Sequence, residues 1–258
     1  MSGQGTDKTD RAPDGAADAG ALRSWPRRPQ RLATAVVEEL VDRIVGGELP
    51  AGSTLPIEPL LCEMFAVSRT VIREVLKALE ANRLVTIQQG SGTKINKAED
   101  WNLLDPVVLA ASIRHDAENA ILEDLVAVRC SLESQMAGQA ALHADEEQRA
   151  RIAARLEQLS HEEEDTARFL RADLDFHYAI MEASGNRLGR AVIQTFNDQA
   201  FQSLRYIGGP TREDCQVSNV GHRAIFEAIT ARDEQGAARA MDEHIRDSWV
   251  RRRPAAGR

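Results

Sequence analysis

The chain is 258 residues long, with a formal net charge of −8 and 43% hydrophobic residues. This length accommodates two domains, and no apolar run approaches the roughly 18 residues of a membrane-spanning helix. The polar amino-terminal segment lacks the apolar core of a secretion signal, so we expect a cytoplasmic protein. Cys62, Cys130 and Cys215 are odd in number and far apart, which favours a reduced protein over a disulfide framework or a cysteine metal site.

Residues 1–29 are rich in Gly, Ala, Asp, Thr and Pro and show almost no apolar periodicity. We predict that they form a disordered tail. A helical period of apolar residues follows, at Val36, Val37, Leu40, Val41 and Ile44. A second, short helix is predicted at residues 57–65, with Leu60, Leu61 and Met64 turned inward.

A third helix and a hairpin complete this predicted domain, which spans residues 30–97. Ser68 is a good helix N-cap, and the helix after it has an apolar face formed by Ile72, Val75, Leu76 and Leu79. Short strands are predicted at residues 84–88 and 93–96, on either side of a Gly-rich turn. Three helices and a hairpin in this order predict a winged helix-turn-helix.

The distribution of charge is more informative than its negative sum. Between Met64 and Lys97 only Glu74 and Glu80 are acidic, whereas the basic residues are Arg69, Arg73, Lys77, Arg83, Lys94 and Lys97. The acidic residues lie mainly beyond this segment. A basic module joined to an acidic one suits a protein that binds nucleic acid through its first half alone.

The third predicted helix carries a cationic stripe opposite its apolar face, because Arg69, Arg73 and Lys77 are spaced i, i+4, i+8. The first residues of a recognition helix reach base edges in the major groove. Arg69, Thr70 and Arg73 are therefore the candidate base readers, with Lys77 on a phosphate. The candidate contacts from the wing are Gln89, Gly90 and Lys94. The alternative, a merely solvated helix face, does not account for the short preceding helix, the tight turn and the Gly-rich wing.

A connector is predicted at residues 98–116, and every segment of residues 117–250 has a helical pattern. The predicted helices are 118–142, 145–163, 166–184, 187–206, 213–232 and 234–250. No strand pattern interrupts them, so we predict an antiparallel helical bundle, followed by a basic tail at 251–258. The predicted fold class is mainly α: a winged helix-turn-helix joined to an all-helical bundle.

Polar residues occupy the inward faces of three of these helices. Asp173 and His177 lie i, i+4 on one, and His222 and His244 lie on two others. Such groups are costly to bury without partners. A divalent metal ion would satisfy all four, and imidazole with carboxylate suits zinc, nickel or manganese. From the residues alone, a metal site and an internal hydrogen-bond network are equal alternatives. The other histidines are expected on the surface: His115, His143 and His161.

Arg129 lies on the apolar stripe of the first bundle helix. One interpretation is an ion pair with Glu133, one turn further along. The other is a guanidinium that receives the carboxylate of a ligand in a bidentate pair. The residues themselves do not decide between these roles.

The first module resembles the winged-helix signature of the GntR family of regulators. The matching segments are Leu55-Pro56 to Glu63, Val67 to Thr70, Arg73-Glu74, Leu76, Leu79-Glu80 and Gly90 to Thr93. The resemblance implies that Arg69, Arg73 and Gly90 contact operator DNA. The family usually has an arginine after the glutamate that follows Leu-Pro, whereas this chain has Pro59, so one habitual DNA contact is missing.

The second half resembles the FCD effector domain of the FadR-type subfamily. The matching segments are Arg129 with Leu132-Glu133, Asp173 with Phe176-His177, Ser184 to Asn186, His222 to Ile225, and His244. With the winged helix, the resemblance covers about residues 31–250. It implies a divalent metal, zinc foremost, on the Asp and three His, and an organic acid held with the help of Arg129. We place Asn186 and Arg205 beside Arg129 as effector-binding residues. Trp101 to Leu109 also resemble the linker of sugar-acid regulators.

These expectations describe a homodimeric repressor that binds palindromic operator DNA, senses a small carboxylate effector at its metal and makes no membrane contact. It is not expected to be an enzyme. A metal-dependent hydrolase is a rival, because three His and an Asp can activate water, but no further inward carboxylate is evident as a base. A non-specific DNA-binding structural protein is a second rival, opposed by the net acidity and the metal-suited bundle core.

Overall fold

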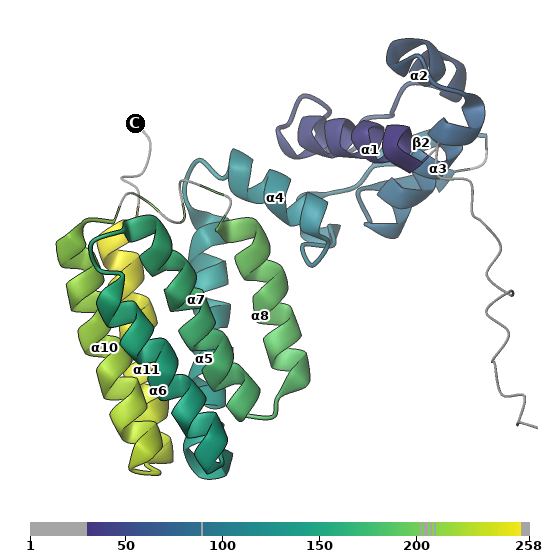
Figure 1. Ribbon diagram of the computed structural model, residues 1–258. Helices are drawn as coiled ribbons and strands as arrows, with labels where there is room; N and C mark the ends of the chain where they lie inside the picture. Colours follow the sequence, from purple (N-terminus) through teal and green to yellow (C-terminus); the bar gives the residue numbers. More distant parts are fainter. Residues whose placement is uncertain are drawn as a thin grey trace, which may run out of the picture.

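The computed structural model describes residues 30–88, 90–201, 203, 206, 208 and 210–253. It contains two helical modules with a further helix between them (Figure 1). The predicted tail at 1–29 lies outside the described residues, as do Gln89, Arg205 and residues 254–258 of the predicted basic tail. That tail was predicted to begin at residue 251, but the last helix continues to Arg252. No described helix has the length and apolar character needed to cross a membrane.

The amino-terminal module is the predicted winged helix-turn-helix. Its elements are α1 (Gln30–Val45), α2 (Glu58–Phe65), α3 (Arg69–Ala81), β1 (Val85–Gln88) and β2 (Gly92–Ile95). The two strands are antiparallel, with Val85 opposite Ile95. The Ser68 side chain accepts a hydrogen bond from the Val71 amide and so caps α3. The predicted apolar face of α3 is buried in one core with α1.

The burial of α2 differs from the prediction. Leu61 is buried, but Leu60 and Met64 are 45% and 52% exposed. This eight-residue helix packs on α3, and a single neighbouring helix covers only a narrow face. The apolar stripe of α2 is wider than the face that α3 covers, so the expected inward position of Leu60 and Met64 is wrong.

The connector contains a packed helix that the sequence analysis did not predict. After a 3-10 turn, η2 (Ala98–Asp100), comes α4 (Pro106–His115), where the Asp105 carboxylate caps the first turn. Val108 and Ala111 of α4 lie in the core of the amino-terminal module, whereas Leu109 and Ile113 lie in the core of the bundle. One short helix is therefore shared by the two modules.

The second module is the predicted antiparallel bundle. Its helices are α5 (Ala120–His143), α6 (Glu146–His161), α7 (Thr166–Ala183), α8 (Arg187–Ala200), α10 (Arg212–Thr230) and α11 (Glu234–Arg252). In Figure 1, α5, α10 and α11 lie together, and α8 lies on the side of α5 and α7 that is nearest α4. The fold class is confirmed, but α8 ends at Ala200, six residues before the predicted end.

Candidate functional site

The described candidate DNA-contacting residues of the amino-terminal module are exposed. Arg69, Thr70, Arg73 and Lys77 are all exposed on α3. Gly90 and Lys94 of the wing are exposed as well. A groove between α3, the segment before α2 and the wing is lined by Glu58, Arg73, Lys77, Gly90 and Thr93, among others. The groove thus brings Arg73 and Lys77 of α3 together with Gly90 of the wing. The other predicted DNA-contacting residues that are described are exposed but do not line it: Arg69, Thr70 and Lys94.

Arg73 is paired on this face with an acidic residue of α2. Its Nε atom lies 3.1 Å from Glu58 Oε2, and the Arg73 side chain is 68% exposed. An exposed pair of this kind contributes only about 0–1 kcal/mol, so a phosphate or a guanine can displace the carboxylate. Pro59 lies in the first turn of α2, where a backbone N–H is not needed. The helix tolerates Pro59, while the cation expected there is lost.

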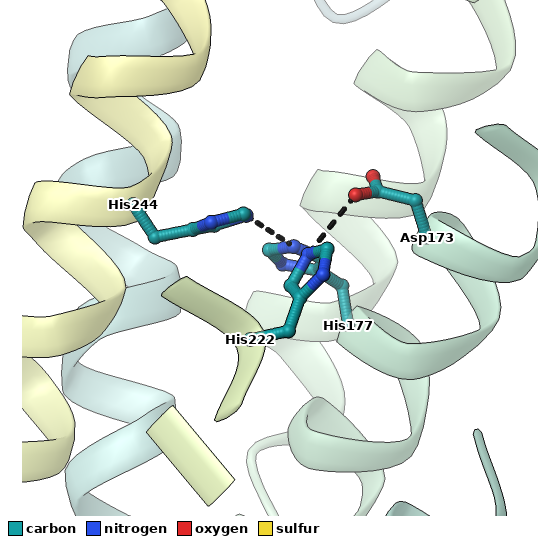
Figure 2. A group of neighbouring side chains, drawn as sticks. All are labelled: Asp173, His177, His222 and His244. Carbon is teal, nitrogen blue, oxygen red and sulfur yellow. Dashed lines mark hydrogen bonds and ion pairs between the residues drawn. The ribbon is translucent and has the colours of Figure 1, made fainter. Parts of the chain in front are cut away.

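Four buried side chains from three helices meet inside the bundle (Figure 2). Asp173 and His177 come from α7, His222 from α10 and His244 from α11. One ligand-type atom from each lies within 4.8 Å of the others. Ligands at about 2.0–2.2 Å from a shared zinc ion are at most roughly 4.4 Å apart. The group is therefore within a few tenths of an ångström of a coordination shell.

Neighbouring residues fix the orientation of two of these histidines. Glu133 Oε2 lies 2.6 Å from His177 Nδ1, and Asn219 Oδ1 lies 3.1 Å from His222 Nδ1. Both acceptors hold the proton on Nδ1, which leaves the Nε2 lone pair for the centre of the cluster. This carboxylate or carbonyl contact on the far nitrogen is typical of metal-ligating histidines.

The contacts inside the cluster are incomplete as hydrogen bonds. His177 Nε2 and His244 Nε2 are 3.2 Å apart. If Glu133 holds the proton of His177 on Nδ1, the lone pair of His177 Nε2 faces His244 Nε2. That lone pair then needs either a proton donated by His244 or a metal cation. His222 Nε2 lies 3.1 Å from Asp173 Oδ1, yet it is buried without an aligned hydrogen-bond partner among the described residues. An unsatisfied buried nitrogen beside the other three ligand atoms fits a bound metal ion.

Electrostatics keeps these groups in the form that binds metal. Burial lowers the pKa of His222 and lowers that of His244 further, where His222 and His177 add to the effect. Burial alone would raise the pKa of Asp173, but the His222 contact and the nearby histidines outweigh it and hold that pKa far below its usual range. These directions favour neutral imidazoles at His222 and His244 and an ionised carboxylate at Asp173.

Arg129 forms the ion pair with Glu133 that was one of its two predicted roles. Its Nε lies 2.6 Å from Glu133 Oε1, and both residues are buried. Its NH1 donates to the Tyr206 hydroxyl. Burial would raise the pKa of Glu133, but Arg129 and His177 lower it to about 2. A chain of buried contacts therefore runs from Tyr206 through Arg129 and Glu133 to His177.

Comparison with known proteins identifies the family of this chain. Residues 32–95 match the bacterial regulatory proteins of the gntR family, and residues 124–247 match the FCD domain. The repressor NanR of Salmonella newport (strain SL254) is 32% identical over 87% of this chain and 86% of its own. The chain belongs to the GntR family. The resemblance of both modules is confirmed, and the FadR-type arrangement of a GntR domain with an FCD domain is present.

One further relative agrees with this GntR-family assignment, and one solved structure shares the fold. The galactonate operon transcriptional repressor of Escherichia coli K12 is 29% identical over 84% of this chain and 94% of its own. A solved structure of Lar, which controls the expression of the agr system in Listeria monocytogenes, covers 88% of this chain and 97% of its own. It matches with a TM-score of 0.52 and 16% identity, which shows the fold alone. The family and its named relatives are transcription regulators, which points to a non-enzyme.

No described contact joins the other candidate effector residue within the described part of this GntR-family chain, Asn186, to the cluster. Asn186 accepts a hydrogen bond from the Gly189 amide and caps α8. It follows the end of α7 at Ala183 and stands in the turn before α8. Arg205 lies outside the described residues. His115, His143 and His161 are exposed as predicted, and His115 Nε2 lies 3.0 Å from Asp42 Oδ1.

The sequence analysis missed two residues that position the cluster. Glu133 was considered only as a partner of Arg129, although it also contacts His177. Asn219 is fully buried and lies three residues before His222, on the same side of α10. Its amide donates to Glu163 Oε1 at 2.7 Å. Buried polar residues one turn from a candidate ligand are the signal that could have identified both.

Proposed function

We propose that this GntR-family regulator is a homodimeric repressor of palindromic operator DNA whose affinity is controlled by a small organic acid. The acid binds at a divalent metal held by Asp173, His177, His222 and His244. The observation that carries the proposal is the buried four-residue cluster, with its oriented histidines and its unsatisfied nitrogen. The name of one relative, a galactonate operon repressor, supports a sugar acid or a related hydroxy acid as the effector.

The metal assignment follows from the donor set. Three imidazoles and one carboxylate suit zinc, with nickel or manganese as alternatives, and zinc binds more tightly than manganese at such a site. When bound, a divalent metal supplies Lewis acidity and coordination positions beyond the four protein ligands. These positions suit the carboxylate of an acid.

Arg129 has an indirect and a direct role in this proposal. Its pair with Glu133 supports the carboxylate that orients His177. A guanidinium has five N–H donors, and the contacts with Glu133 and Tyr206 use two of them. The direct role is a hydrogen bond from a further donor to the carboxylate of the acid. Asn186 and Arg205, also expected at the effector, contribute no described contact to this argument.

The DNA-binding part of the proposal rests on the exposed face of α3 and the wing. Arg69, Thr70 and Arg73 lie in the first turns of α3, where recognition helices read bases. Lys77 and Lys94 are placed to neutralise phosphates. Because a two-fold operator mirrors a two-fold protein, the proposal includes a dimer that presents two such faces.

A metal-dependent hydrolase is the rival from another class. Glu133, the inward carboxylate beside the cluster, is already engaged by Arg129 and His177, and its low pKa makes it a poor general base. An exposed cationic DNA-binding face would also have no role in such an enzyme. Both observations favour the regulator.

The proposal is tested with DNA fragments from upstream of the chain's own gene and its neighbours. Fluorescence anisotropy of the zinc-loaded protein is expected to find a fragment bound far more tightly than bulk competitor DNA. A sugar acid such as galactonate is expected to change that affinity only when the metal is present. Equal affinity for all fragments would support a non-specific DNA-binding protein. An effect of the acid that survives chelation would place effector recognition away from the cluster.

A further inference from the structure

A small cavity adjoins the metal cluster on the Asp173 side. Its volume is about 20 Å³, and it is lined by residues of α7, α10 and α11 together with Pro210. Asp173 is the one cluster residue in its lining. A cavity of this size holds one water-sized group. The space therefore accommodates a single oxygen atom of a ligand beside the cluster.

Helical spacing explains why the lining is polar. The residues four positions from His177, His222 and His244, toward one end of the bundle, are Asp173, Ser218 and Ser248. Residues four positions apart lie on the same face of a helix, about one turn from each other. These three residues therefore form a layer next to the three histidines. All three line the cavity. An aspartate and two serines in a bundle interior form a polar layer where apolar residues would normally pack.

Ser248 lacks a hydrogen-bond partner. Its side chain is 6% exposed, and its hydroxyl is buried without a partner among the described residues. Helical serines often bond to the carbonyl one turn earlier, but this hydroxyl does not. Ser218 is buried nearby, at 9% exposure. A buried hydroxyl without a partner indicates a bound water or a ligand group.

We propose that Ser248, together with Ser218, recognises a hydroxyl group next to the carboxylate of the effector. The inference rests on the proposed function, because the carboxylate then lies at the metal and the hydroxyl in the cavity. A serine hydroxyl both donates and accepts, which matches a ligand hydroxyl. The bundle would therefore bind hydroxy acids in preference to simple carboxylic acids.

The outer rim of the cavity suits an anion. Arg251 and Arg252, at the end of α11, line it one turn beyond Ser248. The rim also contains Asp214, whose carboxylate is held by the Thr211 capping box at the start of α10. At the rim itself, two guanidinium groups therefore lie near one carboxylate, which is already engaged by Thr211. Arg251 and Arg252 are the groups at this rim that could pair with the carboxylate of an acid.

The test compares two acids on zinc-loaded full-length protein. Glycolate carries a hydroxyl beside its carboxylate, and acetate does not. Melting-temperature shifts across a concentration series give the two dissociation constants. Ser248→Ala is expected to weaken glycolate binding roughly three- to tenfold, the range for one lost hydrogen bond, and to leave acetate binding unchanged. Ser218→Ala, a second variant, is expected to act in the same direction.

Ser112→Ala is the matched control, because Ser112 is also buried with an unpartnered hydroxyl but lies on α4. It should change neither constant. If both Ser248→Ala and Ser218→Ala keep their zinc and still prefer glycolate as strongly as the wild type does, this inference is overturned. The proposed function would not be affected by that result. If the zinc-loaded wild type bound neither these acids nor any sugar acid, the proposed function would fail as well.

Discussion

The Glu133→Gln variant tests the contact chain that supports the metal cluster. Glu133 is fully buried, and its two oxygens lie 2.6 Å from Arg129 Nε and from His177 Nδ1. Removing one partner of a buried ion pair leaves the other charge unpaired, which costs about 3–5 kcal/mol. Urea unfolding in the presence of a chelator measures this loss in the metal-free protein.

The same substitution should also weaken metal binding. An amide nitrogen in place of Oε2 donates to His177 Nδ1, which shifts the ring proton to Nε2 and removes the lone pair from the cluster. Loss of such an orienting partner typically lowers metal affinity by about 10–100-fold. Competition for zinc with a coloured chelator measures this second effect.

Glu123→Gln is the control, because Glu123 pairs with Arg253 at 3.4 Å on the surface. It should change stability by less than about 1 kcal/mol and leave zinc affinity unchanged. The reasoning is refuted if Glu133→Gln is as stable as Glu123→Gln and binds zinc as tightly as the wild type.

Three further predictions concern the cluster and the DNA-binding face. Chelation should lower the melting temperature, since zinc at 100 times its dissociation constant adds about 2.7 kcal/mol of stability; His222→Ala should reproduce this loss in calorimetry, and the exposed His143→Ala should not. Gly221→Ala should weaken zinc binding in the chelator competition, because its new Cβ would lie 2.6 Å from His244 Nδ1; unchanged affinity would mean that His244 moves freely. Arg73→Ala should weaken operator binding by about 1–3 kcal/mol if it reads a base, and an equal loss on random DNA would identify a phosphate contact instead.

Local patterns were enough to predict most of the fold. The apolar face of α3 and the Ser68 cap follow from residues within one helix, and both are present. The α4 helix was missed because its short apolar run, residues 106–115, lacks a clear stripe. Its two sides face two different cores, so no single amphipathic pattern can appear. The exposed Leu60 and Met64 were predicted to be buried for a different reason. The hydrophobicity of a residue does not reveal how much of its helix the neighbouring elements cover.

The four candidate metal ligands were predictable because each is a polar residue on an apolar stripe. Their convergence depends on how α7, α10 and α11 pack, which one sequence does not reveal. The orienting residues were harder to recognise. Glu133 has two simultaneous partners, and only the partner within its own helix, Arg129, is visible from spacing. His177 is 44 positions away, a separation that carries no periodic signal.

The shared helix α4 offers a physical route from the proposed effector site to the DNA-binding face. It packs against α8 in the bundle and against α1 in the amino-terminal module. Arg114 Nε and His115 Nε2 each lie 3.0 Å from Asp42 Oδ1 of α1. Because packed helices move as units rather than deforming continuously, a ligand-dependent shift of α8 would carry α4, and α4 would carry α1. In the proposed dimer, this movement would rotate one α3 helix relative to the α3 helix of the other protomer. The rotation would change how well the two helices fit a two-fold operator.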